Sequence, residues 1–185
     1  MGTDPVMGLR LLITLSAGLL LAVPAGPRVD VTELDGIYQV TAAFAVNEAP
    51  DTVMAVLSDF ERIPKFMPDM EVSRVIERNG STLVVEQQAT SRFMLFSKRV
   101  HLVLDVRQED DALRFRDRCG KSFALYEGAW ILSQQDSVTV VDYQLKAKPM
   151  FEVPPFLLKR LLKRDSVDLI DRIKVEITER ADRRK

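Results

Sequence analysis

The order of elements along this chain is the feature that most constrains its fold. One strand is expected at Ile37–Val46, and two short helices follow within 47–70. About six further strands come next, and a long amphipathic helix spans about 154–183. A single sheet of this length needs another element to bury one of its faces, and only the last helix is long enough to do so. A curved antiparallel sheet around one helix leaves room for a cavity, which points to a hydrophobic ligand.

Local patterns support each of these elements. The first strand, YQVTAAFAV, is rich in aromatic and β-branched residues, and Pro50 then suits the first turn of a helix. Asn79-Gly80 separates two strand-like segments and is the strongest short signal for a hairpin. The segment KRVHLVLDVRQ alternates strictly between apolar and polar residues, as expected of a strand with one buried face. The strands therefore form a meander of hairpins, so the sheet is antiparallel.

Composition excludes several classes of chemistry. At 185 residues the chain fits one domain, and its net charge of −1 provides no field that would attract nucleic acid. Cys119 is the single cysteine and His101 the single histidine, so zinc would lack its usual ligands. No glycine-rich loop opens a helix to hold phosphate. We therefore expect no metal, no cofactor and no nucleic-acid partner. The protein is also expected to be a monomer.

The first 25 residues have the pattern of a signal peptide. Arg10 precedes the uncharged apolar run LLITLSAGLLLAV, which has signal-peptide length and is short for a bilayer span. The segment Val23-Pro24-Ala25 then offers a cleavage site. Residues 1–6 are interpreted as extra residues, because Met7 is itself a plausible first residue. A buried core helix is the alternative. We expect residues 1–25 to direct export to a periplasm or the cell exterior, 26–36 to be a polar linker, and 37–185 to be one domain.

Two parts of the sequence resemble a known superfamily. The stretch APDTVMAVLSDFERIPKFMPDM (49–70) resembles the first helix pair of the START-like, or SRPBCC, superfamily, which includes polyketide cyclase/dehydrases and coenzyme-Q-binding proteins. The segments YEGAWIL (126–132) and VDYQL (141–145) are similar to that family's last two strands. The resemblance covers roughly 37–180, and the order of the elements is its specific part. It implies an α+β helix-grip fold: a seven-stranded antiparallel sheet around a C-terminal helix, with a cavity for a lipid, quinone, sterol or polyketide.

Inward-facing side chains of such a fold are the candidate ligand contacts. Tyr126, Gly128 and Trp130 lie two apart and point the same way, and Gly128 leaves space above its strand for a ligand or the long helix. The alternative, which is compatible, is that Trp130 packs on the long helix as plain core. The residues expected to line the cavity are Phe66, Phe115, Tyr126, Trp130, Tyr143, Leu145, Leu161 and Ile173.

Binding and transport of a hydrophobic small molecule is the function that the sequence favours. The first alternative is a polyketide-type cyclase or dehydratase that uses Asp117, Tyr126 or Tyr143 as acid or base. Strand alternation places Asp117 on the apolar face, although its position at the strand end allows solvent or a neighbouring arginine to satisfy it. Export also argues against this alternative, because carrier-bound polyketide intermediates are cytosolic. The second alternative is a non-catalytic interaction domain with a filled core.

Two apolar loops are expected to form a rim at the mouth of the cavity. Hairpin connections and loops are usually polar, so large apolar side chains there indicate a contact surface. The rim consists of Phe93, Met94, Leu95, Phe96, Met150, Phe151 and Phe156. Basic residues at 98–99 and 159–164 flank it, as at membrane surfaces. The rim is therefore expected to touch membranes transiently during ligand loading; the alternative is a closed gate.

Overall fold

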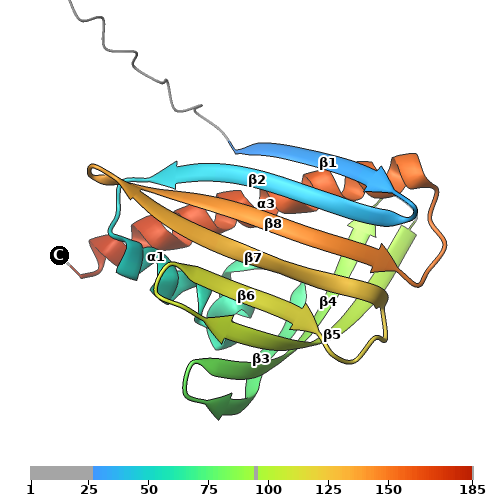
Figure 1. Ribbon diagram of the computed structural model, residues 1–185, viewed down its shortest axis with the longest axis horizontal. Coiled ribbons are helices and arrows are strands. Elements are labelled where there is room, and N and C mark those ends of the chain that lie inside the picture. The colour runs from blue at the N-terminus through green and yellow to red at the C-terminus, as the bar shows by residue number, and fades with distance from the viewer. Residues whose placement is uncertain (1–26, 94–95, 185) are drawn as a thin grey trace, which may run out of the picture.

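The computed structural model describes residues 27–93 and 96–184, with the side chains of 91–97 excepted. Figure 1 shows one sheet, one long helix and a group of short helices. The strands are β1 (Arg28–Leu34), β2 (Ile37–Val46), β3 (Met70–Asn79), β4 (Thr82–Phe93), β5 (Phe96–Gln108), β6 (Ala112–Asp117), β7 (Phe123–Gln135) and β8 (Val138–Pro149). The helices are α1 (Pro50–Leu57), the 3-10 turn η1 (Phe60–Arg62), α2 (Ile63–Phe66) and α3 (Pro155–Asp182).

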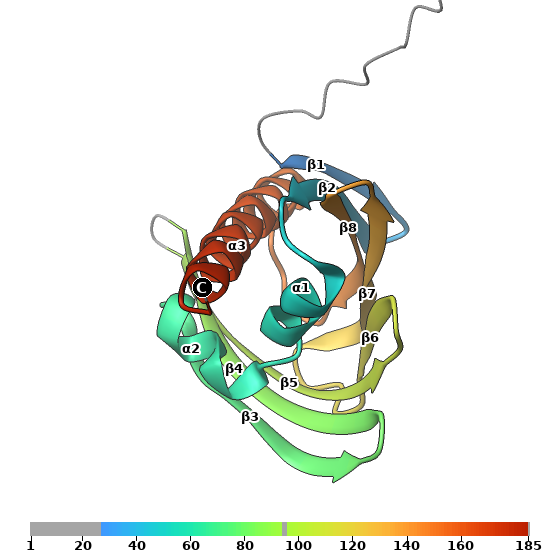
Figure 2. The same ribbon diagram turned by 90° about the vertical axis from the view of Figure 1, so that its left-hand side faces the viewer.

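The sheet is antiparallel throughout and strongly curved. Its strand order is β1-β2-β8-β7-β6-β5-β4-β3. β2 pairs with β8, which is far from it in sequence, and every other pair of neighbouring strands is consecutive in the chain. Figure 2 shows the sheet bent around an interior that α3 closes on the open side and that α1 fills at one end. This is the helix-grip architecture that the resemblance to the START-like superfamily implied.

The sheet has eight strands where seven were predicted, because the segment interpreted as a polar linker forms an edge strand. β1 pairs with β2 along its whole length, from Arg28 opposite Ala43 to Leu34 opposite Ile37. Val29 is buried, whereas the charged neighbours that suggested a linker lie on the exposed face. Asp35-Gly36 closes the hairpin with φ of 53° and 75°, the left-handed pair that a two-residue turn needs. The linker interpretation of 28–34 was therefore wrong.

Two further hairpins reverse at the predicted turns. β3 and β4 meet at Asn79 opposite Thr82, with Gly80 at a φ of 58°. β7 and β8 meet at Gln135 opposite Val138, with Asp136 at a φ of 55°. These residues accept left-handed backbone at low cost, so local sequence fixes where the chain reverses.

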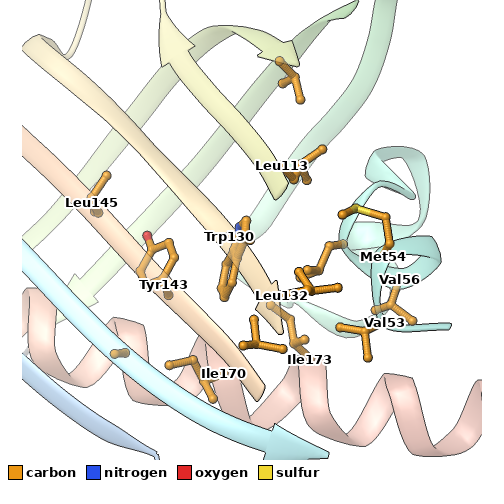
Figure 3. Close-up of a cluster of buried hydrophobic side chains, with 14 of the residues drawn as sticks. Val53, Met54, Val56, Leu113, Trp130, Leu132, Tyr143, Leu145, Ile170 and Ile173 are labelled. Carbon is orange, nitrogen blue, oxygen red and sulfur yellow. The ribbon is translucent and has the colours of Figure 1, made fainter. Parts of the chain in front are cut away.

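The hydrophobic core lies inside the curve of the sheet. Alternate residues of each central strand point inward and meet the apolar stripe of α3, where Ile170 and Ile177 are fully buried. α1 adds its own apolar face, of which Val53 and Val56 are also fully buried. Figure 3 shows Val53, Val56 and Ile170 among the side chains that lie between the sheet, α1 and α3. The core therefore lies between the sheet, α1 and α3.

Some predictions concern residues that the structure does not describe. The proposed signal peptide, residues 1–25, lies outside the described residues, as do Met94 and Leu95 and the side chains of Phe93 and Phe96. Across 27–93 and 96–184, no helix carries an apolar stretch long enough to cross a membrane.

Candidate ligand-binding site

A cavity of about 150 Å³ lies between the inner face of the sheet and α3. Strands β5 to β8 form one wall, through residues such as Leu104, Leu113 and Trp130. Leu169 and Ile173 of α3 form the opposite wall. None of the described residues that line this cavity carries a charge. It is thus an apolar chamber with a few polar groups, the usual composition of a small-molecule site.

The predicted contact residues separate into two groups. The structure places six of the eight on the cavity wall: Phe66, Phe115, Tyr126, Trp130, Tyr143 and Ile173. Leu145 is buried in the core but is not on the wall of this cavity. Leu161 is half-buried near the start of α3 and is not on this wall either. Those two positions were wrong as cavity-lining residues.

The segment from η1 to the start of β3 closes the cavity. Phe60, Ile63 and Phe66 point into it at a spacing of three residues, and Met67 and Met70 extend this wall. Spacing of three matches the 3-10 turn of η1 and its continuation into α2. Of these, only Phe66 was expected to line the cavity. The repeated Phe-x-x-Ile-x-x-Phe pattern is the signal that could have revealed the others.

Trp130 and Tyr143 form the centre of the sheet-side wall. They lie directly opposite each other in the β7–β8 pair, and their rings stack with centroids 4.2 Å apart and planes 27° apart. Both face inward, as strand alternation predicted, and Figure 3 shows them above the α3 residues Ile170 and Ile173. Because the indole lies on the cavity wall and belongs to the core at once, the two interpretations of Trp130 are both correct geometrically.

Gly128 makes room for a protein side chain rather than for a ligand. A Cβ atom at Gly128 would lie 2.6 Å from Cζ of Phe115 and 2.2 Å from the backbone oxygen of Gln144. The Phe115 ring therefore fills the space above the strand, and it in turn contacts Tyr126 with centroids 6.0 Å apart. The interpretation that a ligand or the long helix fills this space was wrong.

Two phenols supply polar groups to the cavity. Burial raises the pKa of Tyr126 to about 12, and the negative charge of Asp117 acts in the same direction. Burial also raises the pKa of Tyr143 well above its ordinary value, with a further contribution from Tyr126. Both hydroxyls are therefore protonated at neutral pH and act as hydrogen-bond donors rather than as bases.

Asp117, the third acid–base candidate, has a structural role at the end of β6. Its carboxylate accepts hydrogen bonds from the backbone N–H groups of Val103 at 2.8 Å and Gly120 at 2.9 Å. A longer bond of 3.3 Å comes from the N–H of Cys119. Asp117 is not among the residues that line the cavity. Asp117 therefore stabilises the turn after β6. The partners of its carboxylate are backbone N–H groups and not the neighbouring arginines, which had been predicted.

The predicted rim is described in part. Met150 is 62% exposed and Phe156 is 77% exposed, whereas Phe151 packs edge-on against Phe123 with centroids 5.8 Å apart. The ammonium group of Lys98 lies 5.1 Å from the centre of the Phe151 ring. That contact brings the loop after β8 beside the start of β5.

A larger hollow lies on the outer face of the sheet but has the wrong chemistry for an apolar ligand. It measures about 740 Å³ and is lined by charged and polar side chains such as Arg114, Arg116 and Lys146. Its arginines already pair with carboxylates, for example Arg114 with Glu109 at 3.3 Å. The inner cavity is therefore the candidate site, although it is the smaller of the two.

The sequence comparisons identify the family. Residues 46–174 match the family described as "Polyketide cyclase / dehydrase and lipid transport", and the chain belongs to that family. No curated protein matches the sequence.

Several solved structures share the fold. A STAR-related lipid transfer protein from Xanthomonas axonopodis is 17% identical with a TM-score of 0.69, over 84% of this chain and 95% of that one. The Zhui aromatase/cyclase of Streptomyces sp. R1128 is 15% identical with a TM-score of 0.67, over 78% and 96%. A START superfamily protein from Mycobacterium smegmatis is 16% identical with a TM-score of 0.64, over 76% and 97%. At these identities the similarity shows the fold alone.

Proposed function

We propose that this protein binds and transports a hydrophobic small molecule in the cavity between the sheet and α3. The observation that supports this most is the chamber of about 150 Å³, which has no charged residue on its described wall. An engineered protein cavity of about the same volume, lined by aliphatic and aromatic side chains, stays dry and binds benzene. The chamber therefore has the volume and chemistry for a ring-sized apolar group, and each buried methylene would contribute about 0.8 kcal/mol.

A larger cargo requires one wall to move, and η1 with α2 is the best candidate. Among the described residues, Arg62 pairs with Glu176 at 3.0 Å and Arg172 donates to the backbone oxygen of Phe66 at 3.3 Å, and both contacts hold this segment on α3. The other contacts of its cavity face are apolar side chains. We therefore propose that cargo enters where these short elements move away from α3, which requires the Arg62–Glu176 pair to break.

The two alternative functions have less support. A cyclase or dehydratase needs at least two groups that exchange protons near neutral pH. Asp117 is engaged with backbone N–H groups, and the raised pKa values of Tyr126 and Tyr143 keep both phenols neutral. An interaction domain with a filled core would contain no internal chamber of about 150 Å³. The export of this carrier, proposed from residues 1–25, rests on the sequence pattern alone.

Iodobenzene is a suitable probe of the proposed function, because its seven heavy atoms suit a ring-sized chamber. We expect isothermal titration calorimetry to give a Kd of about 1 mM or tighter, equivalent to about −4 kcal/mol. Met70→Trp, which puts an indole into the chamber from a half-buried position, should weaken binding at least about tenfold. Met150→Trp, at an exposed position, is the matched control. Equal binding by all three proteins would refute the proposal.

Contact with an anionic membrane is proposed as the route of loading. Phe156, Lys159, Arg160 and Lys163 lie at i, i+3, i+4 and i+7 of α3, so one helix face combines an exposed aromatic ring with basic groups. Exposed Met150 and the ammonium of Lys98 lie on the adjacent loop and strand. Each basic group would add about 1 kcal/mol near an anionic surface, and salt would screen this attraction.

Co-sedimentation with anionic liposomes tests this contact. The double variant Met150→Ser, Phe156→Ser should bind at least about tenfold more weakly than wild type, because two apolar side chains no longer enter the interface. High salt should weaken wild-type binding as well. Val175→Ser removes another exposed apolar side chain, 58% exposed on α3, and should have no effect. If wild type ignores anionic liposomes, loading proceeds in another way.

A further inference from the structure

The polar groups on the cavity wall are few and are mostly hydrogen-bond donors. Among the described residues that line the chamber, those with polar side-chain atoms are Gln87, Tyr126, Trp130 and Tyr143. The side-chain amide of Gln87 donates to the hydroxyl of Ser73 at 3.2 Å, so it already has a partner inside the protein. The hydroxyl groups of Tyr126 and Tyr143, in contrast, have no such partner in the part of the chain that the structure describes.

Neither phenol hydroxyl has a hydrogen-bond partner among the described residues. Burial and nearby charge account for the raised pKa values of Tyr126 and Tyr143, without a hydrogen bond to either oxygen. Among the described residues, the buried side-chain polar atom without a partner is Nη2 of Arg180, so the two phenol oxygens are open to the chamber, where water or a ligand can reach them. Figure 3 shows its hydroxyl oxygen on the side of the ring away from Ile170 and Ile173. A ligand that displaces water from these hydroxyls must supply an acceptor, or it loses the hydrogen bonds that the water made.

The two phenols reach the same chamber from adjacent strands. Tyr126 lies on β7 two residues before Gly128, and Tyr143 lies on β8 two residues before Leu145, the partner of Gly128. Both side chains line the cavity, and the charge of an ionised Tyr126 would oppose ionisation of Tyr143. A bound molecule in the chamber thus meets two neutral O–H donors on otherwise apolar walls.

We infer that Tyr126 and Tyr143 hold an uncharged oxygen acceptor of the ligand, such as a ketone, quinone or ester carbonyl. This rests on the proposed function, because it names the chemical class of the molecule in the same chamber. A carbonyl accepts hydrogen bonds from phenols and carries no charge to desolvate. A carboxylate or phosphate is excluded from this position, because no cation lines the described wall to offset the cost of burying an anion. A pure hydrocarbon leaves both donors unsatisfied.

Three probes of nearly equal size separate these classes. Acetophenone carries a carbonyl, α-methylstyrene replaces that oxygen by a CH2 group, and benzoate carries a carboxylate. Binding of each is measured by calorimetry at pH 7 in wild type, in Tyr126→Phe, in Tyr143→Phe and in the double variant. The useful quantity is the ratio of acetophenone to α-methylstyrene affinity, because it cancels the difference in hydrophobicity between wild-type and variant proteins.

Each lost hydroxyl should lower that affinity ratio by about threefold to tenfold, the usual net effect of one hydrogen bond. The affinity for α-methylstyrene should stay the same or rise, and benzoate should not bind. Tyr38→Phe is the matched control, because Tyr38 is buried in β2 but does not line the chamber. The unliganded Tyr→Phe variants should melt no lower than wild type, which keeps a folding defect from imitating the result.

The outcomes separate this inference from the proposed function. If α-methylstyrene binds but the ratio is unchanged in the double variant, the chamber takes apolar ligands and the role of the phenols is wrong. Benzoate binding as tightly as acetophenone would also overturn the inference. If none of the three probes binds, the proposed function fails and the inference fails with it.

Discussion

Gly128→Ala is expected to lower the free energy of unfolding by about 3 kcal/mol or more, at the upper end for overpacked cores. The added methyl group would lie 2.2 Å from the backbone oxygen of Gln144 and 2.6 Å from Cζ of Phe115. A flexible side chain can move aside, but the backbone of β8 is held by its hydrogen bonds to β2 and β7. The substitution therefore separates strands at the cavity wall, and urea denaturation measures the loss.

Gly120→Ala is the control for this prediction. Gly120 has a φ of 60° and no atom within 4 Å of the added carbon, so only the cost of left-handed backbone applies. That cost is about 1–2 kcal/mol for a residue with a side chain. A Gly128→Ala variant no less stable than Gly120→Ala would show that β7 and β8 do not approach each other as described.

Glu176→Gln is expected to cost about 3 kcal/mol, because it removes the buried anion that pairs with three arginines in η1, in α3 and just after α3. The Glu176 side chain is 7% exposed and pairs with Arg180 at 2.7 Å, Arg62 at 3.0 Å and Arg183 at 3.4 Å. Arg180 also pairs with Asp59 at 2.9 Å and donates to the backbone oxygen of Ala55 at 3.2 Å. The cluster therefore joins α3 to α1 and η1, and thermal or chemical unfolding measures its contribution.

Glu179→Gln is the matched control for Glu176→Gln. Glu179 pairs with Arg183 at 3.4 Å but is 56% exposed, and exposed pairs contribute about 0–1 kcal/mol. A loss for Glu176→Gln as small as that for Glu179→Gln would show that the buried carboxylate of Glu176 does not hold α1, η1 and α3 together.

The same cluster gives a direction for the dependence of stability on pH. Burial opposes ionisation of the Glu176 carboxyl, but the hydrogen bond from Arg180 and the nearby arginine charges outweigh it, so its pKa is lowered. A carboxyl with a lowered pKa stabilises the fold above its unfolded-state pKa of about 4.3, and that contribution is lost as pH falls through the folded-state pKa. Wild type should thus lose more stability than Glu176→Gln between neutral and acidic pH. Parallel curves would contradict this.

The fold was predictable because its signals are local and occur in a specific order. Turn residues such as Asn79-Gly80 fix the hairpins, and alternation assigns the faces of the central strands. β1 was missed because its charged residues suggested a linker, although Asp35-Gly36 was an equally good hairpin signal. Two alternating valines between charges are a weak pattern, and it is pairing with β2 that makes this segment a strand.

The site was predictable only in part, for a geometric reason. Strand alternation correctly predicted that Tyr126, Trp130 and Tyr143 face inward. It does not predict how far along each strand the cavity extends. Leu145 therefore shares the inward face and still lies off the cavity wall. On α3, Ile173 faces the chamber and Leu161 does not, because Leu161 lies more than three turns nearer the start of the helix. Which turns of α3 meet the chamber is set by tertiary packing.

The structure of a crystal soaked with iodobenzene tests the central claim most directly, because anomalous scattering locates the iodine without ambiguity. The account predicts iodine between the sheet and α3, in contact with the chamber wall formed by Phe66, Trp130 and Ile173. Iodine bound only elsewhere, for example in the outer hollow beside Arg114 and Lys146, would contradict it.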